Sequence, residues 1–240
     1  MSEHGPPSDL VTRHRWREKF PSFLTHNAVN VIDHGAVGDG THDDSVALQR
    51  AVAVASGTLA KTVFLPRGVY AIGTTINVTD GVSLVGVAKH LSRIVAAPGF
   101  YQRKGQVTPL VQVVNDANAT TATTTATTAL AFFSITVWNS VSNVSALHWS
   151  SNGGTTRQIH FNRASTCGST PSAACHQPPT TINHPMMLVT GPRASLKVYT
   201  FFLEDCCKSE RFPWVGGNGN DGFWKGWLAG PQGPGKCFLS

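Results

Sequence analysis

The stretch from Val29 to Ala55 constrains the fold more than any other part of this chain. Its first residues, Val29, Val31 and Ile32, are β-prone and predict a short strand. A turn should follow, because glycine accepts positive φ and aspartate can bond to its own backbone. We expect this turn to be a structural motif, and its residues are Gly35, Gly38, Asp39, Gly40, Asp43 and Asp44.

A short helix is predicted directly after the turn. Leu48, Val52 and Ala55 form an apolar stripe at helical spacing, and Gly57 lies where a helix would end. Asp43 and Asp44 precede the stripe, and either carboxylate can accept a hydrogen bond from a free N–H group at the helix start. Such an amphipathic helix can cover one end of a hydrophobic stack.

The same turn could be compared with a dinucleotide site or a calcium loop, but it matches neither pattern. The order Gly35-x-x-Gly38-x-Gly40 differs from the G-x-G-x-x-G of dinucleotide sites, and three aspartates would repel a pyrophosphate. A calcium loop would need the D-x-D-x-D-G pattern and a distal glutamate, which this turn lacks. We therefore favour a purely structural turn and cap.

The segment Thr62–Ala88 predicts several short strands in succession. Val63, Phe64 and Leu65 form an apolar run that ends at Pro66, and further strands are expected near Tyr70, around Ile76–Val78 and from Val82. Strands of this length, separated by turns, fit an all-β stack or barrel.

These two segments carry a specific resemblance. VNVIDHGAVGDGTHDDSVALQ, followed by FLPRGVYAI and GVSLVGVA, is similar to the N-terminal region of the pectate lyase superfamily, which includes rhamnogalacturonase and epimerase-like β-helix proteins. Val144–Ser165 resembles more narrowly the exo-1,3-β-glucanase branch. We place the resemblance over residues 28 to about 205.

The resemblance implies an all-β fold, a right-handed parallel β-helix with a short capping α-helix at its N-terminal end. It also implies action on polysaccharide, with glycoside hydrolysis of glucan or pectin type as the first hypothesis. A polysaccharide lyase, a non-catalytic polysaccharide-binding or cell-wall-associated module, and an inactive fragment remain alternatives. Members of the family usually work outside the cell, although the basic N-terminus has no apolar segment typical of a signal peptide.

Three regions are expected along the chain. Residues 1–26 form a polar, basic arm, residues 27–205 the β-helix, and residues 206–240 a Gly-rich tail that reads as truncated or disordered, so we expect an incomplete chain. Apolar strand starts at Val82, Leu110, Phe132, Ile159 and Met187 suggest coils of 22 to 28 residues.

Composition bears on possible partners. Charged residues make up only 13% of the chain and its formal net charge is +6, which could favour an acidic polysaccharide. No basic run is interleaved with aromatic residues and no apolar run reaches 18 residues, so we expect neither a nucleic-acid partner nor a membrane. The oligomeric state is not predicted.

Few residues are candidates for chemistry. Glycoside hydrolysis needs two carboxylic groups, and outside the N-terminal turn the acids cluster at Glu204, Asp205 and Glu210. Glu204 and Asp205 are the catalytic candidates. As strand neighbours they should face opposite sides, however, which makes them a poor pair by themselves and leaves a solvent-facing acid and a turn acid as the alternative.

Substrate-binding candidates lie further towards the middle of the chain. His160 should face away from Ile159 and Phe161, and Arg157 precedes it on the same predicted strand. Trp149 could stack on a sugar ring or, equally, fill a corner of a coil. For all three, a structural or solvated position is the alternative.

No cofactor and no metal is expected. Five cysteines cannot all pair within one chain. A zinc site made of Cys175, His176, Cys206 and Cys207 would lack C-x-x-C spacing, so free thiols or one or two disulfides are favoured.

Overall fold

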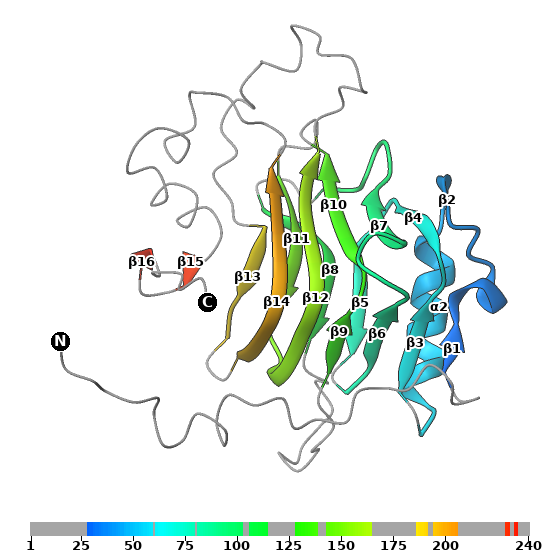
Figure 1. Cartoon of the computed structure of the whole chain (residues 1–240), viewed down its shortest axis with the longest axis horizontal. Coiled ribbons are helices and arrows are strands. Elements are labelled where there is room, and N and C mark those ends of the chain that lie inside the picture. Colours follow the sequence, from blue (N-terminus) through cyan, green and yellow to red (C-terminus); the bar gives the residue numbers. More distant parts are fainter. Residues whose placement is uncertain are drawn as a thin grey trace, which may run out of the picture.

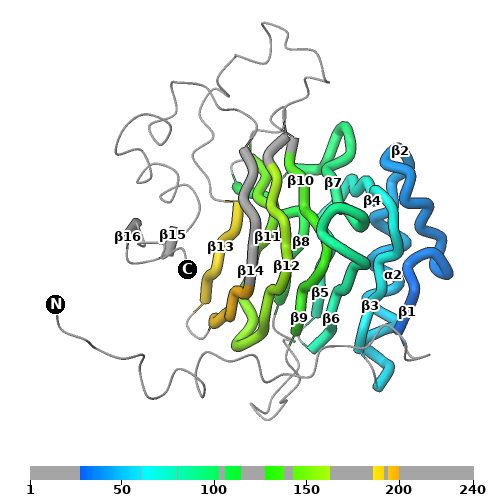
Figure 2. The backbone as a smooth tube through the Cα atoms, viewed as in Figure 1, coloured from blue at the N-terminus to red at the C-terminus, as the bar shows by residue number. Residues whose placement is uncertain are grey.

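The protein is a parallel β-helix whose N-terminal end is covered by one α-helix (Figure 1). The computed structural model describes residues 28–59, 61–79, 81–102, 106–114, 128–138, 143–164, 186–191, 194–205, 229–230 and 233–234. Within these ranges each pairing is parallel except that of β15 (Ala229–Gly230) with β16 (Gly233–Pro234). Successive coils therefore stack along one axis, as the tube in Figure 2 shows.

The first face of the stack is formed by one short strand from each coil. Its order is β1, β3, β6, β9 and the first part of β12. The strands are β1 (Val29–Asn30), β3 (Thr62–Leu65), β6 (Ser83–Gly86), β9 (Ala129–Ala131) and β12 (Asn152–Ala164).

The second face runs beside the first. Its order is β2, β4, β7, β10 and the second part of β12, and β14 pairs with both parts of β12. The additional strands are β2 (Asp39–Asp43), β4 (Gly68–Ile72), β7 (Ser92–Ala96), β10 (Ser134–Trp138) and β14 (Ser195–Asp205). The long β12 joins the two faces, and Gln158, with a φ of 53°, lies at the point where it passes from one to the other.

The third face closes the coil. It has the order β13, β11, β8, β5. The strands are β5 (Ile76–Thr79), β8 (Thr108–Val114), β11 (Val144–Trp149) and β13 (Met187–Val189).

In-register apolar residues from successive coils build the core. On the second face Tyr70, Ile94, Ile135 and Phe161 pair in sequence, and all four are fully buried. On the third face the same holds for a column that is at most 5% exposed, Ile76, Val111, Leu147 and Met187. Parallel strands lie about 4.8 Å apart. Each column is therefore a continuous row of side chains that contact their neighbours above and below.

Helix α2 (Ser45–Ser56) covers the first coil, where its apolar stripe completes the core. Leu48, Ala51 and Ala55 are fully buried against β1, β3 and β5, while Val46 and Val54 on the other side are exposed. The helix ends at Ser56 and Gly57 is its C-cap, where the sequence predicts the helix to stop. The short helix η1 (Val31–His34) precedes it and ends at Gly35 in the left-handed conformation.

The free edge of the third sheet is covered by one side chain of this helix. β5 is the first strand of that sheet, and the Gln49 amide donates to the carbonyl oxygen of Asn77 at 3.0 Å and accepts from its N–H at 2.9 Å. Gln49 thus takes the place of a neighbouring strand at this position. An exposed strand edge would otherwise offer these groups to another chain.

Two expectations drawn from the sequence are wrong. Residues 39–43, expected to be part of a turn, form the short edge strand β2, which pairs with β4 through an irregular register, so the turn segment 35–44 contains a short strand. The regular spacing of strand starts is also not a coil repeat, because Val82 precedes a strand of the first face whereas Leu110 and Met187 lie on the third.

The predicted terminal regions fall largely outside the described residues. Of the arm at residues 1–26 nothing is described, and of the tail at 206–240 only the pair β15 and β16 is. The described helices are too short or too polar to cross a membrane.

Candidate functional site

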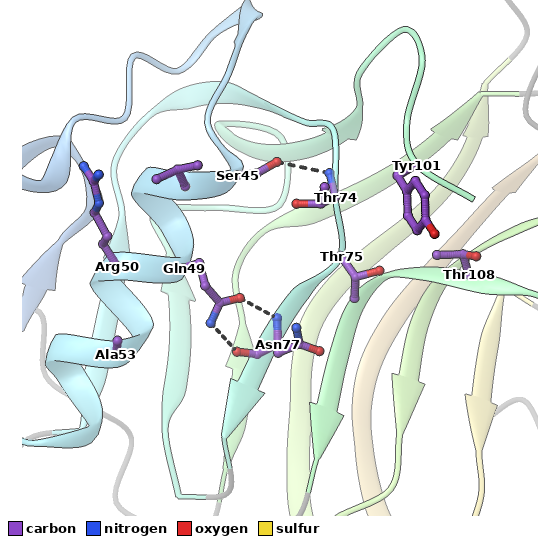
Figure 3. Close-up of a pocket in the computed structure, with 10 residues that line it drawn as sticks. Ser45, Gln49, Arg50, Ala53, Thr74, Thr75, Asn77, Tyr101 and Thr108 are labelled. Atoms are coloured by element: carbon purple, nitrogen blue, oxygen red, sulfur yellow. Dashed lines mark hydrogen bonds between the residues drawn. The ribbon is translucent and has the colours of Figure 1, made fainter. Parts of the chain in front are cut away.

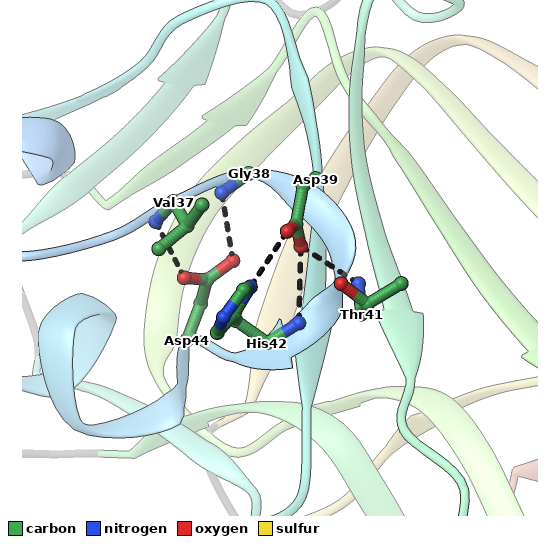
Figure 4. Close-up of polar contacts among 6 residues, drawn as sticks. All are labelled: Val37, Gly38, Asp39, Thr41, His42 and Asp44. Carbon is green, nitrogen blue, oxygen red and sulfur yellow. Dashed lines mark hydrogen bonds and ion pairs between the residues drawn. The ribbon is translucent and has the colours of Figure 1, made fainter.

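The predicted turn motif forms a compact network at the N-terminal end of α2 (Figure 4). Asp44 is almost completely buried, and its carboxylate accepts hydrogen bonds from the N–H groups of Val37 at 2.7 Å and Gly38 at 3.1 Å. Asp39 accepts from the N–H groups of Thr41 at 2.8 Å and His42 at 3.0 Å. Its other oxygen lies 2.6 Å from Nδ1 of His42.

Asp43 joins this turn to the next coil. Its Oδ1 accepts from the N–H of Ser45 at 2.9 Å and from the N–H of Gly73 at 3.0 Å, and the Ser45 hydroxyl donates to the same oxygen. The side chain of Asp43, rather than that of Asp44, therefore caps the helix start, since Asp44 makes no side-chain bond to the helix.

The pKa values of these acids follow from their surroundings. Backbone hydrogen bonds from His42 and Thr41 hold the pKa of Asp39 well below its usual range. Partial burial raises the pKa of Asp43, but hydrogen bonds from Ser45 and Gly73 outweigh it, so the net shift is downward. Burial raises the pKa of Asp44 despite its two backbone donors, and the negative charges of Asp39 and Asp43 add to that.

All three carboxylates thus accept hydrogen bonds, those of Asp39 and Asp44 from the turn itself and that of Asp43 from the helix start and the next coil. Asp44 also acts on the core: burial, and then the charge of Asp44, raise the pKa of Tyr70 to about 12. The Tyr70 hydroxyl donates to the carbonyl of Pro66 at 2.9 Å, and its ring packs on Gly38, where an added Cβ would lie 3.0 Å from Cε1. This geometry supports a structural role for the turn.

The outer side of the second face carries a polar row in the middle of the stack. Arg93, Ser134 and His160 pair in register on β7, β10 and β12, and none belongs to the core cluster. Ile159 and Phe161 are core residues, so His160 faces away from the core. It is nevertheless only 7% exposed, and its ring meets that of the exposed His90 edge-on with centroids 5.7 Å apart.

Arg157 lies on the other side of the bend in β12. It is half-buried and pairs in register with Ala131 on β9 and Tyr199 on β14. Arg157 and His160 are thus brought to neighbouring faces on either side of Gln158, not to one continuous face.

The two catalytic candidates end β14. Glu204 takes the register position beside Asn162, and Asp205 that beside Arg163. Asn162 pairs in register with Thr136, which pairs with Val95, and Val95 with Ala71. On β12 this row lies two residues after the row of His160. The structure thus brings Glu204 and the His160 row onto neighbouring positions of β12 and β14.

The predicted stacking role of Trp149 is wrong. Trp149 is fully buried in the core, and its indole N–H donates to the carbonyls of Ser151 and Ser195, each at 3.1 Å. Its ring lies against Gly154, which has no side chain to block it. The alternative, that this ring fills a coil, describes its position.

The sequence did not reveal His90, Arg93 or Ser134 as neighbours of His160. Their proximity depends on strand register, and β7, β10 and β12 are separated by long connections of no clear periodicity. No group of three His, Cys, Asp or Glu side chains suited to a metal occurs in the ranges that the structure describes. The cysteines weighed for zinc, Cys175, Cys206 and Cys207, lie outside those ranges.

A stack of parallel coils with a helical cap defines the class of pectate-lyase-like β-helix proteins. The chain belongs to the family described as rhamnogalacturonase A/epimerase, pectate lyase-like, whose model matches residues 28–182. The family and the fold predicted from the sequence are thereby confirmed.

Three curated relatives match parts of the chain. Over 83 residues it is 37% identical to the non-secreted LysM effector LysM19 of Penicillium expansum, covering 33% of this chain and 6% of the relative. Over 52 residues it is 44% identical to the mannuronan C5-epimerase AlgE6 of Azotobacter vinelandii, covering 22% and 6%. Over 97 residues it is 29% identical to a glucan 1,3-β-glucosidase of Cochliobolus carbonum, covering 40% and 12%. The matched segments thus span only a small part of each relative.

Solved structures show a distant similarity. The A-module of the mannuronan C-5 epimerase AlgE4 of Azotobacter vinelandii matches with a TM-score of 0.35 and 20% identity, covering 56% of this chain and 37% of that one. An iota-carrageenase complexed to iota-carrageenan fragments matches with a TM-score of 0.42 and 19% identity, covering 75% and 37%.

Proposed function

We propose that this protein binds a polysaccharide along the outer side of its second face and hydrolyses a glycosidic bond there. The observation that carries the proposal is the family match over residues 28–182, together with the in-register row of Arg93, Ser134 and His160. Because neighbouring strands repeat about every 4.8 Å, side chains in register form a linear array along the stack axis. A linear array suits a long chain better than a small molecule.

Basic side chains supply the contacts of this face. Arg93 on this face and Arg157 on the neighbouring first face are half-buried, and His90 is exposed beside His160. A guanidinium group has several donors in a fixed plane, so it can bridge sugar hydroxyls or a sugar carboxylate. Most of the surface of His160 is covered. Its contribution therefore comes through its edge-on contact with the exposed ring of His90.

Hydrolysis requires a proton donor and a second carboxylate. The two groups lie ~5–5.5 Å apart in retaining and ~6.5–9.5 Å apart in inverting enzymes. Glu204 is the proposed acid, since its register position adjoins the row of His160, and Asp205 is the second candidate. Consecutive strand residues alternate between faces, so Asp205 would have to act from the end of the strand.

Binding without turnover is the second candidate function. It is favoured by one observation: Asp39, Asp43 and Asp44 all act as hydrogen-bond acceptors at the capped end of the stack, which leaves Glu204 and Asp205 as the described acids whose register positions lie near the polar row. A lyase reaction would instead need a base and a cation that neutralises a uronate. By family resemblance we also propose an extracellular place of action.

Reducing-sugar release from laminarin and from pectin by the full chain tests this function. We expect release from one of them, and a loss of 10²-fold or more in Glu204→Gln, about what removal of a general acid costs. Asp205→Asn is the matched comparison. An unsaturated, ultraviolet-absorbing product would identify a lyase. Binding with no product would establish the binding module, and neither binding nor product would refute the proposal.

A further inference from the structure

A pocket of about 600 Å³ opens beside α2, at the end of the stack that this helix covers (Figure 3). One wall is the helix, with Gln49 and Arg50. The other walls are the turn between β4 and β5, the start of β5, Tyr101, and Thr108 at the start of β8. The pocket shares no residue with the outer row of Arg93, Ser134 and His160.

Hydrogen bonds between different coils fix these walls. Gln49 is bound to the backbone of Asn77 through both amide atoms. The Ser45 hydroxyl accepts from the N–H groups of Gly73 at 2.8 Å and Thr74 at 3.2 Å. The Thr75 hydroxyl donates to the carbonyl of Pro109 at 2.7 Å. A pocket whose walls are held in this way loses little conformational freedom when a ligand enters.

Several side chains in the pocket are left for a ligand. Within the described part of the chain, the Thr74 hydroxyl, the Asn77 side-chain amide and the Arg50 guanidinium have no hydrogen-bond or ionic partner. Tyr101 is 64% exposed, and its N–H donates to the carbonyl of Gly73 at 2.8 Å, which holds its backbone against the β4–β5 turn. Figure 3 shows Arg50 and Tyr101 at opposite ends of the pocket.

This set of groups matches a sugar ring. Hydroxyl and amide groups can donate to and accept from sugar hydroxyls, and a tyrosine offers an apolar ring face with a polar tip. The volume lies within the range of about 300–1,000 Å³ typical of small-ligand pockets. Among the described lining residues Arg50 alone is charged, so a cation is disfavoured and a sugar carboxylate is attracted.

We propose that this pocket is a second carbohydrate-binding site, separate from the outer face, which holds one or two pyranose residues against Tyr101 and favours those that bear a carboxylate. The site would hold the polysaccharide at the capped end of the stack. It does not depend on turnover or on the outer row, because it shares no side chain with them.

Titration of the full chain with laminaritriose and with trigalacturonate, followed by ligand-observed NMR and calorimetry, tests the site. The chain should come from a bacterial host, because Asn77 begins an Asn-Val-Thr sequon and a glycan there would fill the pocket. We expect Tyr101→Ala to weaken binding of both sugars about tenfold, while Tyr101→Phe, which keeps the ring, stays near wild type. Arg50→Ala should abolish the preference for trigalacturonate.

Arg93→Ala serves as the control that separates this site from the proposed function. With Arg93→Ala, binding at the pocket should persist even if the outer face loses its ligand. Unchanged binding in Tyr101→Ala, with both variants folded by circular dichroism, would overturn the second site and leave the outer face untouched. Equal affinity for the two trisaccharides would overturn the charge preference.

Discussion

Single residues matter most in this fold where a side chain crosses close to another coil. Gly154 has a φ of 138°, and an added Cβ would lie 2.2 Å from Cζ2 of Trp149 and 2.8 Å from the carbonyl oxygen of Thr128. Both the backbone angle and the space therefore exclude a side chain there.

We expect Gly154→Ala to destabilise the protein by about 2–5 kcal/mol, the sum of overpacking and backbone strain. Gly99→Ala is the matched control, because Gly99 has a φ of 82° but nothing within 4 Å of an added Cβ. That control should lose only about 1 kcal/mol. Urea unfolding measures both, and equal losses would mean that Trp149 moves aside without cost.

The buried carboxylate of Asp44 is a second side chain on which the local structure depends. Asp44→Ala removes a buried carboxylate and leaves the partly buried N–H groups of Val37 and Gly38 without their acceptor, which should cost about 1–3 kcal/mol. Asp33→Ala, which changes an exposed aspartate on η1, should change stability by less than about 0.5 kcal/mol. Thermal unfolding distinguishes the two, and a neutral Asp44→Ala would show that the turn does not need this carboxylate.

Among the elements, the edge strand β5 depends on one helix side chain. Gln49→Ala should cost about 1–2 kcal/mol, because both backbone groups of Asn77 lose their partner. Gln49→Glu keeps the acceptor for the Asn77 N–H but places a carboxylate against the Asn77 carbonyl. We therefore expect it to be little more stable than Gln49→Ala. Unfolding curves and size-exclusion chromatography test this, since a bare edge should also promote self-association. A monomeric, fully stable Gln49→Ala would contradict the edge-covering role.

The pH dependence of stability is tied to β11 and the residue that follows β13. His148 is half-buried, its Nε2 lies 2.6 Å from the Thr190 hydroxyl oxygen, and burial lowers its pKa from the ordinary 6.5. The unfolded chain therefore binds this proton more tightly than the folded one. Stability from this residue is present above pH 6.5 and falls as the pH drops below that value.

His148→Gln should flatten this decline relative to wild type, with little change above pH 7.5. The measurement is the free energy of unfolding at a series of pH values. A steeper decline in the variant would contradict the assigned direction. His34→Gln is the comparison, because His34 lies on η1 at the capped end of the stack, away from β11 and β13.

Over the whole molecule, local sequence signals predict the first coil correctly. They do not predict which of the later strands pair with one another. The apolar stripe and Gly57 correctly place α2, and the strands from Val63 to Val85 fall where short apolar runs are separated by turns. These are contacts between residues close in sequence. The spacing of later strand starts mixed two different faces, because connections of unequal length break any period.

For the candidate site, too, the sequence does not predict which residues become neighbours through strand pairing. Alternation correctly turns His160 away from Ile159 and Phe161, yet it says nothing of the strands that lie beside it. Trp149 was open to two interpretations, because a ring that fills a coil and a ring that binds sugar have the same sequence pattern. Only the register with β8 and β13, and the contact with Gly154, distinguish them.

In a stack of coils, each coil contacts mainly its neighbours, so a destabilising substitution should affect chiefly the coils next to it. Leu48 of α2 is fully buried against the first coil, so Leu48→Ala should cost about 2–5 kcal/mol. Leu147 is equally buried but lies in mid-stack, between Val111 and Met187. Amide hydrogen exchange should therefore lose protection first in β3 and β5 for Leu48→Ala, and in β8 and β13 for Leu147→Ala. If both variants lost protection evenly from β3 to β13, the coils would unfold as a single unit, and the helix would stabilise the entire stack rather than its first turn.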